Sequence, residues 1–247
     1  MDLWGITDIG KVRRQNQDVF KTLVNEEKNV AVFVVCDGMG GARSGNVASE
    51  IAAETFMRYM ENYLAQTSEL NDVAMVMADA VIAANNAVLE KSLRSIECAG
   101  MGTTLTAAIS TAGGEVVVNI GDSRAYHITA TRIYQVTTDH SVVEEMIARG
   151  DLTRAESLRH PKKNLITRAL GTGFNEEPDV FFPYLDAGDY LLLCSDGLTN
   201  LVSDTEIMHR LHKGGNAREC CTNLVELALD RGAPDNVTVV VYKKGGV

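Results

Sequence analysis

The chain has 247 residues, of which 45% are hydrophobic, and a formal net charge of −10 at neutral pH. This length and composition are those of a globular protein with a sizeable core, and we expect a single domain. The acidic charge argues against general nucleic-acid binding, which requires clustered lysine and arginine side chains. We expect no membrane-spanning segment and no secretion signal, and therefore a cytoplasmic location.

The five cysteines do not suggest a disulfide framework, because their number is odd and Cys220 and Cys221 are adjacent. Cys36 and Cys194 lie inside apolar runs. No pair has the CxxC spacing of a zinc site. The cysteines are therefore expected to be reduced thiols within strands and helices.

The amino-terminal part predicts a buried strand followed by two long helices. Residues 30–36 are apolar and rich in valine, which is typical of a strand buried on both faces. Residues 44–66 repeat apolar side chains four apart, which predicts an amphipathic helix capped by Ser44 or Asn46. A second helix is expected from about Leu70 to Leu93. Two such helices in succession should pack as a hairpin over one sheet.

Short β-rich runs follow and predict an antiparallel meander. They lie at 103–110, 115–121, 125–130 and 133–138. From Asp139 to about Gly173 polar residues dominate, with one short helix expected at 141–150. This segment is expected to be a mobile excursion beside the core.

The carboxyl-terminal part returns to regular elements. It predicts a buried strand, two helices and a final strand, at 189–195, 203–214, 216–232 and 236–243. The chain contains no repeat array or linker that would divide it.

Aspartates stand at the ends of several predicted strands. Asp37, Asp122 and Asp196 each follow an apolar strand, and Asp235 precedes the last one. A strand start and a strand end meet at the same edge of an antiparallel sheet, so these carboxylates can converge. A single Asp-Gly pair more often marks a turn. Four converging carboxylates, however, repel one another unless a cation lies between them.

Carboxylate oxygens are the ligands that Mg²⁺ and Mn²⁺ prefer. Two ions that share a carboxylate are suited to the hydrolysis of a phosphate ester. Near the start of the chain, Lys11, Arg13 and Arg14 form a basic cluster before Asp18. Such a cluster is usually a solvated turn, but an arginine beside a metal site can bind a phosphoryl group through its planar fork.

An ordered set of motifs covers almost the whole chain. The motifs are VRRQNQD, VVCDGMGG, GTTL, NIGDSRAY, LLCSDGLT and APDNVTVVVY. Together they resemble the metal-dependent Ser/Thr protein phosphatases of the protein phosphatase 2C type, in the compact bacterial form. The resemblance implies an α+β fold, a four-layer αββα sandwich in which helix pairs flank two antiparallel β-sheets. It also implies one catalytic domain over residues 1–247, with a flap next to the active site at about 139–173.

The resemblance assigns metal contacts to particular residues. It implies that Asp37 bridges two Mg²⁺ or Mn²⁺ ions, and that the Gly38 carbonyl and Asp18 complete the protein contacts of one ion. The other ion would be held by Asp196 and Asp235.

The resemblance also implies further roles around the two ions. Asp122, together with Asp196, matches a third and weaker metal site of bacterial relatives. Arg13 matches the arginine that binds the substrate phosphate. The implied reaction is direct attack of a metal-bridging hydroxide on phosphoserine or phosphothreonine in proteins, without a phosphoenzyme. The implied partners are phosphorylated proteins, with a Ser/Thr kinase as the antagonist, and the expected state is a monomer.

One position departs from the pattern of eukaryotic family members. They often carry a histidine two residues after the bridging aspartate, where this chain has Met39. A thioether cannot donate a proton to the leaving alkoxide. A metal-bound water is the first candidate for the general acid, and His160 in the predicted flap is a distant second.

Two alternatives stay open beside this interpretation. A metal-dependent phosphohydrolase of a small metabolite could have the same active-site residues. A non-catalytic sensor or adaptor of the same fold should lack metal ligands, whereas all five aspartates and Arg13 are present.

Overall fold

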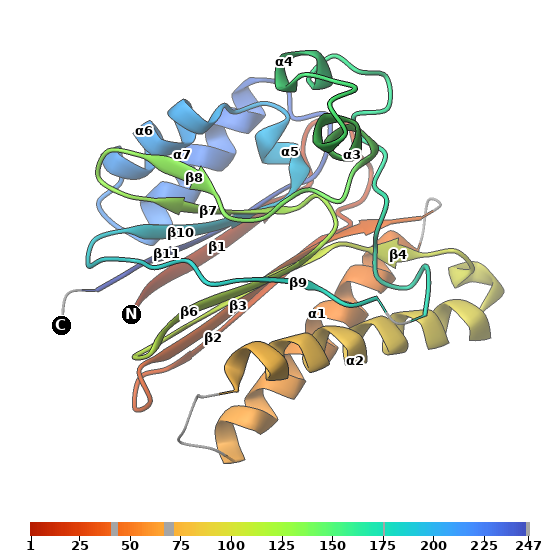
Figure 1. The fold of residues 1–247 in the computed structure, drawn as a ribbon, viewed down its shortest axis with the longest axis horizontal. Coiled ribbons are helices and arrows are strands. Elements are labelled where there is room, and N and C mark those ends of the chain that lie inside the picture. The colour runs from red at the N-terminus through yellow and green to blue at the C-terminus, as the bar shows by residue number, and fades with distance from the viewer. Residues whose placement is uncertain (41–43, 67–71, 175, 246–247) are drawn as a thin grey trace.

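Two antiparallel β-sheets pack face to face, and helices cover the outer face of each (Figure 1). The structure is a computed structural model that describes residues 1–40, 44–66, 72–174 and 176–245. The layers follow the order helices, sheet, sheet, helices, which confirms the predicted α+β fold and the αββα sandwich.

The first sheet has five strands within the described residues, all paired antiparallel. Their order is β1 (Asp2–Asp8), β11 (Val237–Lys243), β10 (Tyr190–Cys194), β7 (Arg124–Ile128) and β8 (Ile133–Gln135). The two termini therefore meet in this sheet, because β1 pairs with β11 along its full length.

The second sheet is also antiparallel and carries the long valine-rich strand β3. Its order is β2 (Asp18–Asn25), β3 (Val30–Met39), β5 (Leu105–Thr111), β6 (Gly114–Ile120) and β9 (Asp179–Phe181), and β4 (Gly102–Thr103) pairs with the end of β3. Residues 30–36 are fully buried, because one face of β3 meets the helices and the other meets the first sheet.

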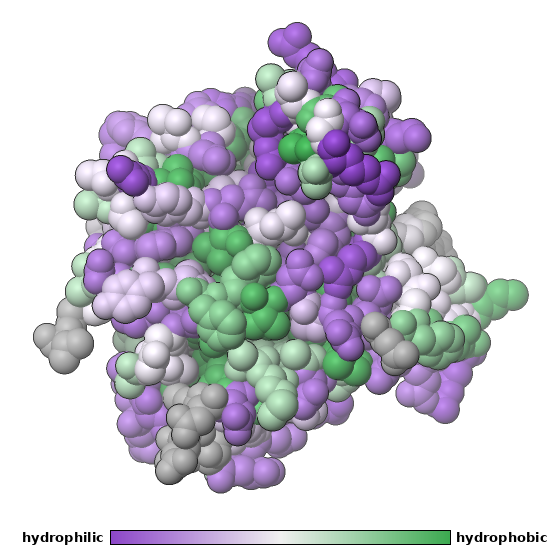
Figure 2. Space-filling model, in the orientation of Figure 1, coloured by the Kyte–Doolittle hydropathy of each residue, from purple (hydrophilic) through white to green (hydrophobic). Residues whose placement is uncertain are grey.

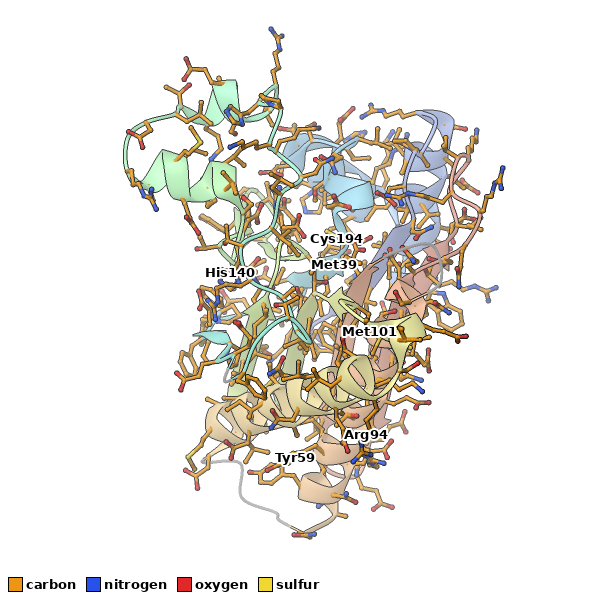
Figure 3. All side chains as sticks on the ribbon, turned by 90° about the vertical axis from the view of Figure 1, so that its right-hand side faces the viewer. Met39, Tyr59, Arg94, Met101, His140 and Cys194 are labelled. Atoms are coloured by element: carbon orange, nitrogen blue, oxygen red, sulfur yellow. The ribbon has the colours of Figure 1, made fainter. Side chains whose placement is uncertain are left out.

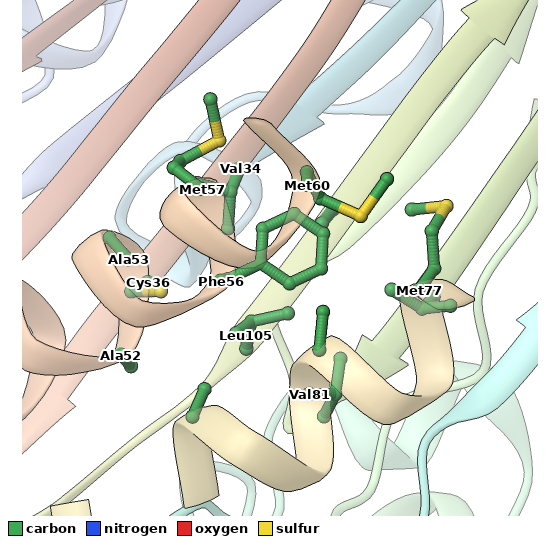
Figure 4. Close-up of a cluster of buried hydrophobic side chains, with 14 of the residues drawn as sticks. Val34, Cys36, Ala52, Ala53, Phe56, Met57, Met60, Met77, Val81 and Leu105 are labelled. Atoms are coloured by element: carbon green, nitrogen blue, oxygen red, sulfur yellow. The ribbon is translucent and has the colours of Figure 1, made fainter. Parts of the chain in front are cut away.

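The predicted helix hairpin covers the second sheet. It consists of α1 (Gly45–Gln66) and α2 (Val73–Arg94), followed by the short 3₁₀ turn η1 (Ile96–Cys98). Figure 4 shows Phe56 and Met60 of α1 gathered with Val81 of α2 and Leu105 of the sheet. Helix α1 begins directly after Ser44, one of the two predicted caps, while Asn46 lies inside the helix. The predicted start of the second helix at Leu70 lies outside the described residues.

Helix α2 is the one helix of the described residues that is long and apolar enough, by length and composition, to cross a membrane. Its apolar side chains, including Met77, Val81 and Val88, are buried against α1 and the second sheet. The core helix of a globular protein can have the same composition, and α2 packs in the core as such a helix does.

The first sheet is covered by the helices near the carboxyl terminus. These are α5 (Asp196–Thr199), α6 (Asp204–Lys213) and α7 (Ala217–Asp230). Helices α6 and α7 match the two predicted ones, whereas α5 follows β10 directly and has no counterpart in the sequence prediction. Both adjacent cysteines, Cys220 and Cys221, are buried in this layer, and all five cysteines are free thiols as expected.

The predicted meander is divided between the two sheets. Strands β5 and β6 form a hairpin in the second sheet, whereas β7 and β8 form a hairpin in the first. The chain crosses between the sheets at residues 121–123, where Gly121 has a φ of 110°. The crossing places Asp122 at the end of the sandwich.

The segment 139–173, called the flap segment below, contains α3 (Val142–Ala148) and α4 (Arg154–Ser157). Figure 1 shows both helices outside the sandwich, above the ends of the strands. The two ends of the segment are not an excursion beside the core. Leu170 is fully buried in the core of the helix hairpin, and His140 is also buried. Figure 2 shows apolar side chains gathered in the middle of the face drawn in Figure 1, with hydrophilic ones around them.

Candidate metal and phosphate site

Most of the predicted site residues line one cavity at the end of the sandwich, with a volume of about 240 Å³. They come from five separate parts of the chain, which the fold brings together. The predicted residues that line the cavity are Arg13, Asp37, Gly38, Asp122, Asp196 and Asp235. The structure therefore brings the four predicted carboxylates to the lining of one cavity.

Asp37 lies within strand β3 and not in a turn after it, because β3 continues to Met39. It pairs in register with Asp18 of β2. Its backbone N–H donates to Thr104 Oγ1 at 2.9 Å, and its carbonyl accepts from Thr104 N and Thr103 Oγ1. The ladder and these hydroxyl groups fix the backbone of Asp37 from both sides.

Asp196 and Asp235 are brought together by a close approach of two backbones. Asp196 is the first residue of α5, and Asp235 precedes β11. A Cβ atom on Gly197 would lie 1.9 Å from the carbonyl oxygen of Asn236, so only glycine fits at this position.

Asp18 lies beneath the cavity and does not line it. It is buried, and its Oδ2 accepts hydrogen bonds from Ser195 Oγ at 2.8 Å and Thr238 Oγ1 at 2.7 Å. Its other oxygen, Oδ1, is buried without a hydrogen-bond partner in the described residues. A buried unpartnered carboxylate oxygen is costly, and it is the kind of atom that a cation or a water satisfies.

Burial and mutual repulsion raise the pKa values of these carboxyl groups. Burial is the largest cause in each case. It raises the pKa of Asp18 to about 6 and that of Asp122 to about 7. The pKa of Asp37 is raised well above its usual value, first by burial and then by the charges of Asp18 and Asp196, and the pKa of Asp196 is raised by burial and by Asp235. The fold thus holds several carboxylates where their charge is unfavourable without a cation.

Arg13 stands at the rim of the cavity in the loop between β1 and β2. Its Nη2 donates to Asp235 Oδ2 at 2.7 Å, and this bond, followed by the nearby carboxylates, raises the pKa of the guanidinium. The residue predicted to bind phosphate therefore contacts a predicted metal ligand.

Asn236 holds this loop in place, a role that the sequence did not indicate. Its Oδ1 accepts from Gln17 N at 2.9 Å, and its Nδ2 donates to Ile9 O and Gln15 O. Asn236 is buried, so the loop that carries Arg13 is tied to the strand that follows Asp235. The only sequence feature that pointed to Asn236 was its position directly after Asp235. Its hydrogen-bond partners lie more than 200 residues earlier in the chain, so no local sequence pattern could reveal them.

Met39 and His160 take different positions relative to the site. Met39 lines the cavity, and in Figure 3 it lies near the middle of the molecule, between the flap helices and α2. His160 does not line the cavity, and its Nδ1 accepts a hydrogen bond from Lys162 N at 3.2 Å in the flap segment. The structure does not bring His160 to the carboxylates.

The donor set fits hard divalent cations. Four carboxylates and the backbone of Gly38 line the cavity, and the Asp18 oxygen without a partner lies beneath it. Among the described residues, no three His, Cys, Asp or Glu side chains lie close enough together to form a ligand cluster. Carboxylate and carbonyl oxygen donors, without a thiolate or imidazole among them, select Mg²⁺ or Mn²⁺ over zinc or copper.

The fold and the site define a class: an αββα sandwich with a carboxylate cluster and an arginine at one end of its sheets. Residues 11–224 match the family model described as protein phosphatase 2C. The chain belongs to this family and is a serine/threonine protein phosphatase.

Curated relatives are similar over almost their whole length. The serine/threonine phosphatase stp of Listeria monocytogenes is 34% identical over 241 residues, which cover 96% of this chain and 94% of the relative. The protein phosphatase PhpP of Streptococcus pneumoniae is 34% identical over 242 residues, which cover 98% and 96%.

Solved structures show the same fold. The serine/threonine phosphatase Stp1 from Staphylococcus aureus matches with a TM-score of 0.91 and 34% identity, covering 100% of this chain and 96% of that one. The catalytic domain of the phosphatase PstP, solved in complex with two manganese ions, matches with a TM-score of 0.84 and 34% identity, covering 99% and 98%.

Proposed function

We propose that this phosphatase hydrolyses phosphoserine and phosphothreonine in proteins with two Mg²⁺ or Mn²⁺ ions held at the carboxylate cavity. The observation that carries the proposal is the convergence of Asp37, Asp122, Asp196 and Asp235 in one cavity with Arg13 at its rim. The manganese ions in the structure of PstP support the choice of metal.

The chain offers a separate role for each ligand. Asp37 would bridge the two ions, and the Gly38 carbonyl would contact one of them together with Asp18, whose buried Oδ1 has no partner among the described residues. Asp196 and Asp235 would hold the other ion.

A third and weaker ion would use Asp122 together with Asp196. Both carboxylates line the cavity, and the charge of Asp196 is the second cause, after burial, of the raised pKa of Asp122. A cation between them would remove this repulsion.

Bound divalent ions supply a water-derived nucleophile near neutral pH and neutralise charge on the phosphoryl oxygens. The residues of the chain do the rest. Arg13 binds the phosphoryl oxygens through its planar guanidinium and holds the phosphorus in line for attack. The buried hydroxyl groups of Ser195 and Thr238 hold Asp18, and Thr104 holds the backbone of Asp37, so the carboxylates stay aligned through the reaction.

The position two residues after Asp37 supplies no proton for the leaving oxygen. Met39 occupies the position beside Gly38 and Gly40 and cannot donate. Water in the cavity is therefore assigned the proton transfer in preference to His160, which does not line the cavity.

The remaining proposals concern the whole protein. Residues 1–247 would form one catalytic domain with the flap segment at its edge. The enzyme would act as a monomer in the cytoplasm, on phosphoproteins made by a Ser/Thr kinase. The match of nearly full-length relatives supports a catalytic unit of this size.

The test is hydrolysis of a phosphothreonine peptide and of a panel of phosphorylated metabolites, each with Mn²⁺, with Mg²⁺ and with EDTA. We expect peptide hydrolysis that EDTA abolishes and Mn²⁺ restores. Full activity in EDTA would refute the metal-dependent mechanism, and hydrolysis confined to one metabolite would favour a small-molecule phosphohydrolase.

A further inference from the structure

A second cavity, of about 290 Å³, opens beside the cavity that the four carboxylates line, which is called the metal cavity below. The two cavities are continuous, because Asp122, Asn164 and Asp196 line both. The outer wall of the second cavity comes from the flap segment, and the opposite wall comes from α5. A substrate whose phosphoryl group fills the metal cavity can therefore place a neighbouring side chain in this one.

The charge of Arg124, which also lines the second cavity, is already compensated. Its Nε and Nη2 donate to the Asp139 carboxylate at 2.6 to 3.0 Å, and its Nη1 donates to Tyr126 Oη at 3.0 Å. Asp139 is buried, so this pair is a fixed, nearly neutral part of the wall.

Lys163 is the cation of this cavity that lacks an acidic partner. Its Nζ donates to the neutral Asn200 Oδ1 at 3.3 Å, and no carboxylate of the described residues lies within ion-pair distance of it. Beside it, Val143 and Leu158 form an apolar part of the wall, and the Leu158 side chain is 71% exposed. In Figure 2 the surface over α3 and α4 likewise carries apolar side chains among hydrophilic ones.

We propose that the second cavity binds a glutamate side chain that lies near the phosphorylated residue in the protein substrate, and that Lys163 selects for it. The methylene groups of glutamate would contact Leu158 and Val143, while its carboxylate would pair with the Lys163 ammonium. The cavity would thus give preference to acidic sequences around the phosphorylation site. This inference rests on the proposed action on phosphoproteins.

The aspartates of the cavity do not cancel this preference. Asp122 and Asp196 also face the metal cavity, where bound cations would offset their charge, and Asp139 is paired with Arg124. Lys163 is left as the charge that a substrate side chain meets.

The experiment compares phosphothreonine peptides that differ by one residue, glutamate or lysine, placed in turn at each position near the phosphothreonine. At one of these positions, kcat/KM of the wild-type enzyme should be about fivefold higher for the glutamate peptide than for the lysine peptide. This ratio corresponds to the upper end of the energy of an exposed ion pair. Lys163→Glu should reverse the preference toward lysine. Each rate is divided by the rate of the same variant on p-nitrophenyl phosphate, which has no neighbouring residue.

The matched control is Lys162→Glu, because Lys162 is exposed, carries the same charge and does not line the cavity. This variant should keep the wild-type preference. An unchanged preference in Lys163→Glu, or the same reversal in both variants, would overturn the inference while leaving the phosphatase activity intact. If the wild-type enzyme hydrolyses none of the peptides, the proposed function itself fails.

Discussion

Arg13 and Asp235 are in direct contact, although the family resemblance gives one to the phosphate and the other to a metal ion. Their atoms lie 2.7 Å apart, and both side chains line the cavity. An arginine has five donors, so a single bond to Asp235 leaves part of the fork free for a phosphoryl group.

Arg13→Ala is expected to raise KM for a phosphothreonine peptide by about tenfold, because hydrogen bonds to a charged group are lost. Arg13→Lys should restore part of the loss, since a point charge replaces a planar fork. Arg14→Ala is the control, because Arg14 is exposed and does not line the cavity. Steady-state kinetics with the peptide measure the effect, and equal KM values for Arg13→Ala and Arg14→Ala would contradict the assignment.

If Asp37 is the bridging ligand that we propose, Asp37→Asn should lower turnover by at least about 100-fold, because loss of such a ligand exceeds the effect of losing a supporting contact. The metal-free variant should be at least as stable as the metal-free wild-type protein, since a buried charge that other carboxylates repel has been removed. Kinetics and thermal unfolding in EDTA measure the two effects. A variant that is both inactive and much less stable would show a structural role for the charge instead.

At the level of secondary structure, the contact between α5 and the start of β11 positions two of the carboxylates. Gly197→Ala should lower the free energy of unfolding by about 1–3 kcal/mol, because a methyl group would overlap the Asn236 carbonyl. It should also weaken Mn²⁺ binding, since Asp196 would move away from Asp235.

Gly113→Ala is the matched control for this substitution. Its Cβ would meet only Thr111 Oγ1, at an ordinary 3.6 Å. Thermal unfolding and Mn²⁺ titration of both variants test the point. Equal stability of the two variants would contradict the close-packing argument.

The elements with a strong hydrophobic period could be predicted from the sequence, and those fixed by distant contacts could not. The valine-rich strand β3 and the hairpin of α1 and α2 lie close to the residues at which the pattern of apolar side chains predicted them. The division of the meander between two sheets depends on the crossing at 121–123, and α5 depends on packing against residue 236. Such contacts join residues far apart in the chain, so local patterns do not reveal them.

The residues of the candidate site could be predicted because they too stand in local sequence patterns. The carboxylates stand at or near strand ends in recognisable motifs, and all but Asp18 line one cavity. The supporting contacts of Asp18, Thr104 and Asn236 were not predicted, because serine, threonine and asparagine occur at many positions without such partners.

At the scale of the whole molecule, the carboxylate cluster makes the stability of the metal-free protein depend on pH. The folded-state pKa values of Asp18 and Asp122 are raised to about 6 and about 7, mainly by burial. The folded protein therefore binds protons that the unfolded chain releases above about pH 4, so its stability falls as pH rises through these values.

Thermal unfolding in EDTA should accordingly show a Tm that decreases from about pH 5 to about pH 8. Saturating Mn²⁺ should reduce the decrease at the upper end, because the ions stabilise the ionised carboxylates. Parallel curves with EDTA and with Mn²⁺ would contradict the view that these groups form the metal site.

The central claim is that Asp37 joins metal ions to the carboxylates around it, and calorimetric titration of Mn²⁺ into the metal-free protein tests it most directly. The account predicts binding of at least two ions to the wild-type protein and loss of the tight binding in Asp37→Asn. The same number of ions bound with the same affinity by both proteins would contradict it.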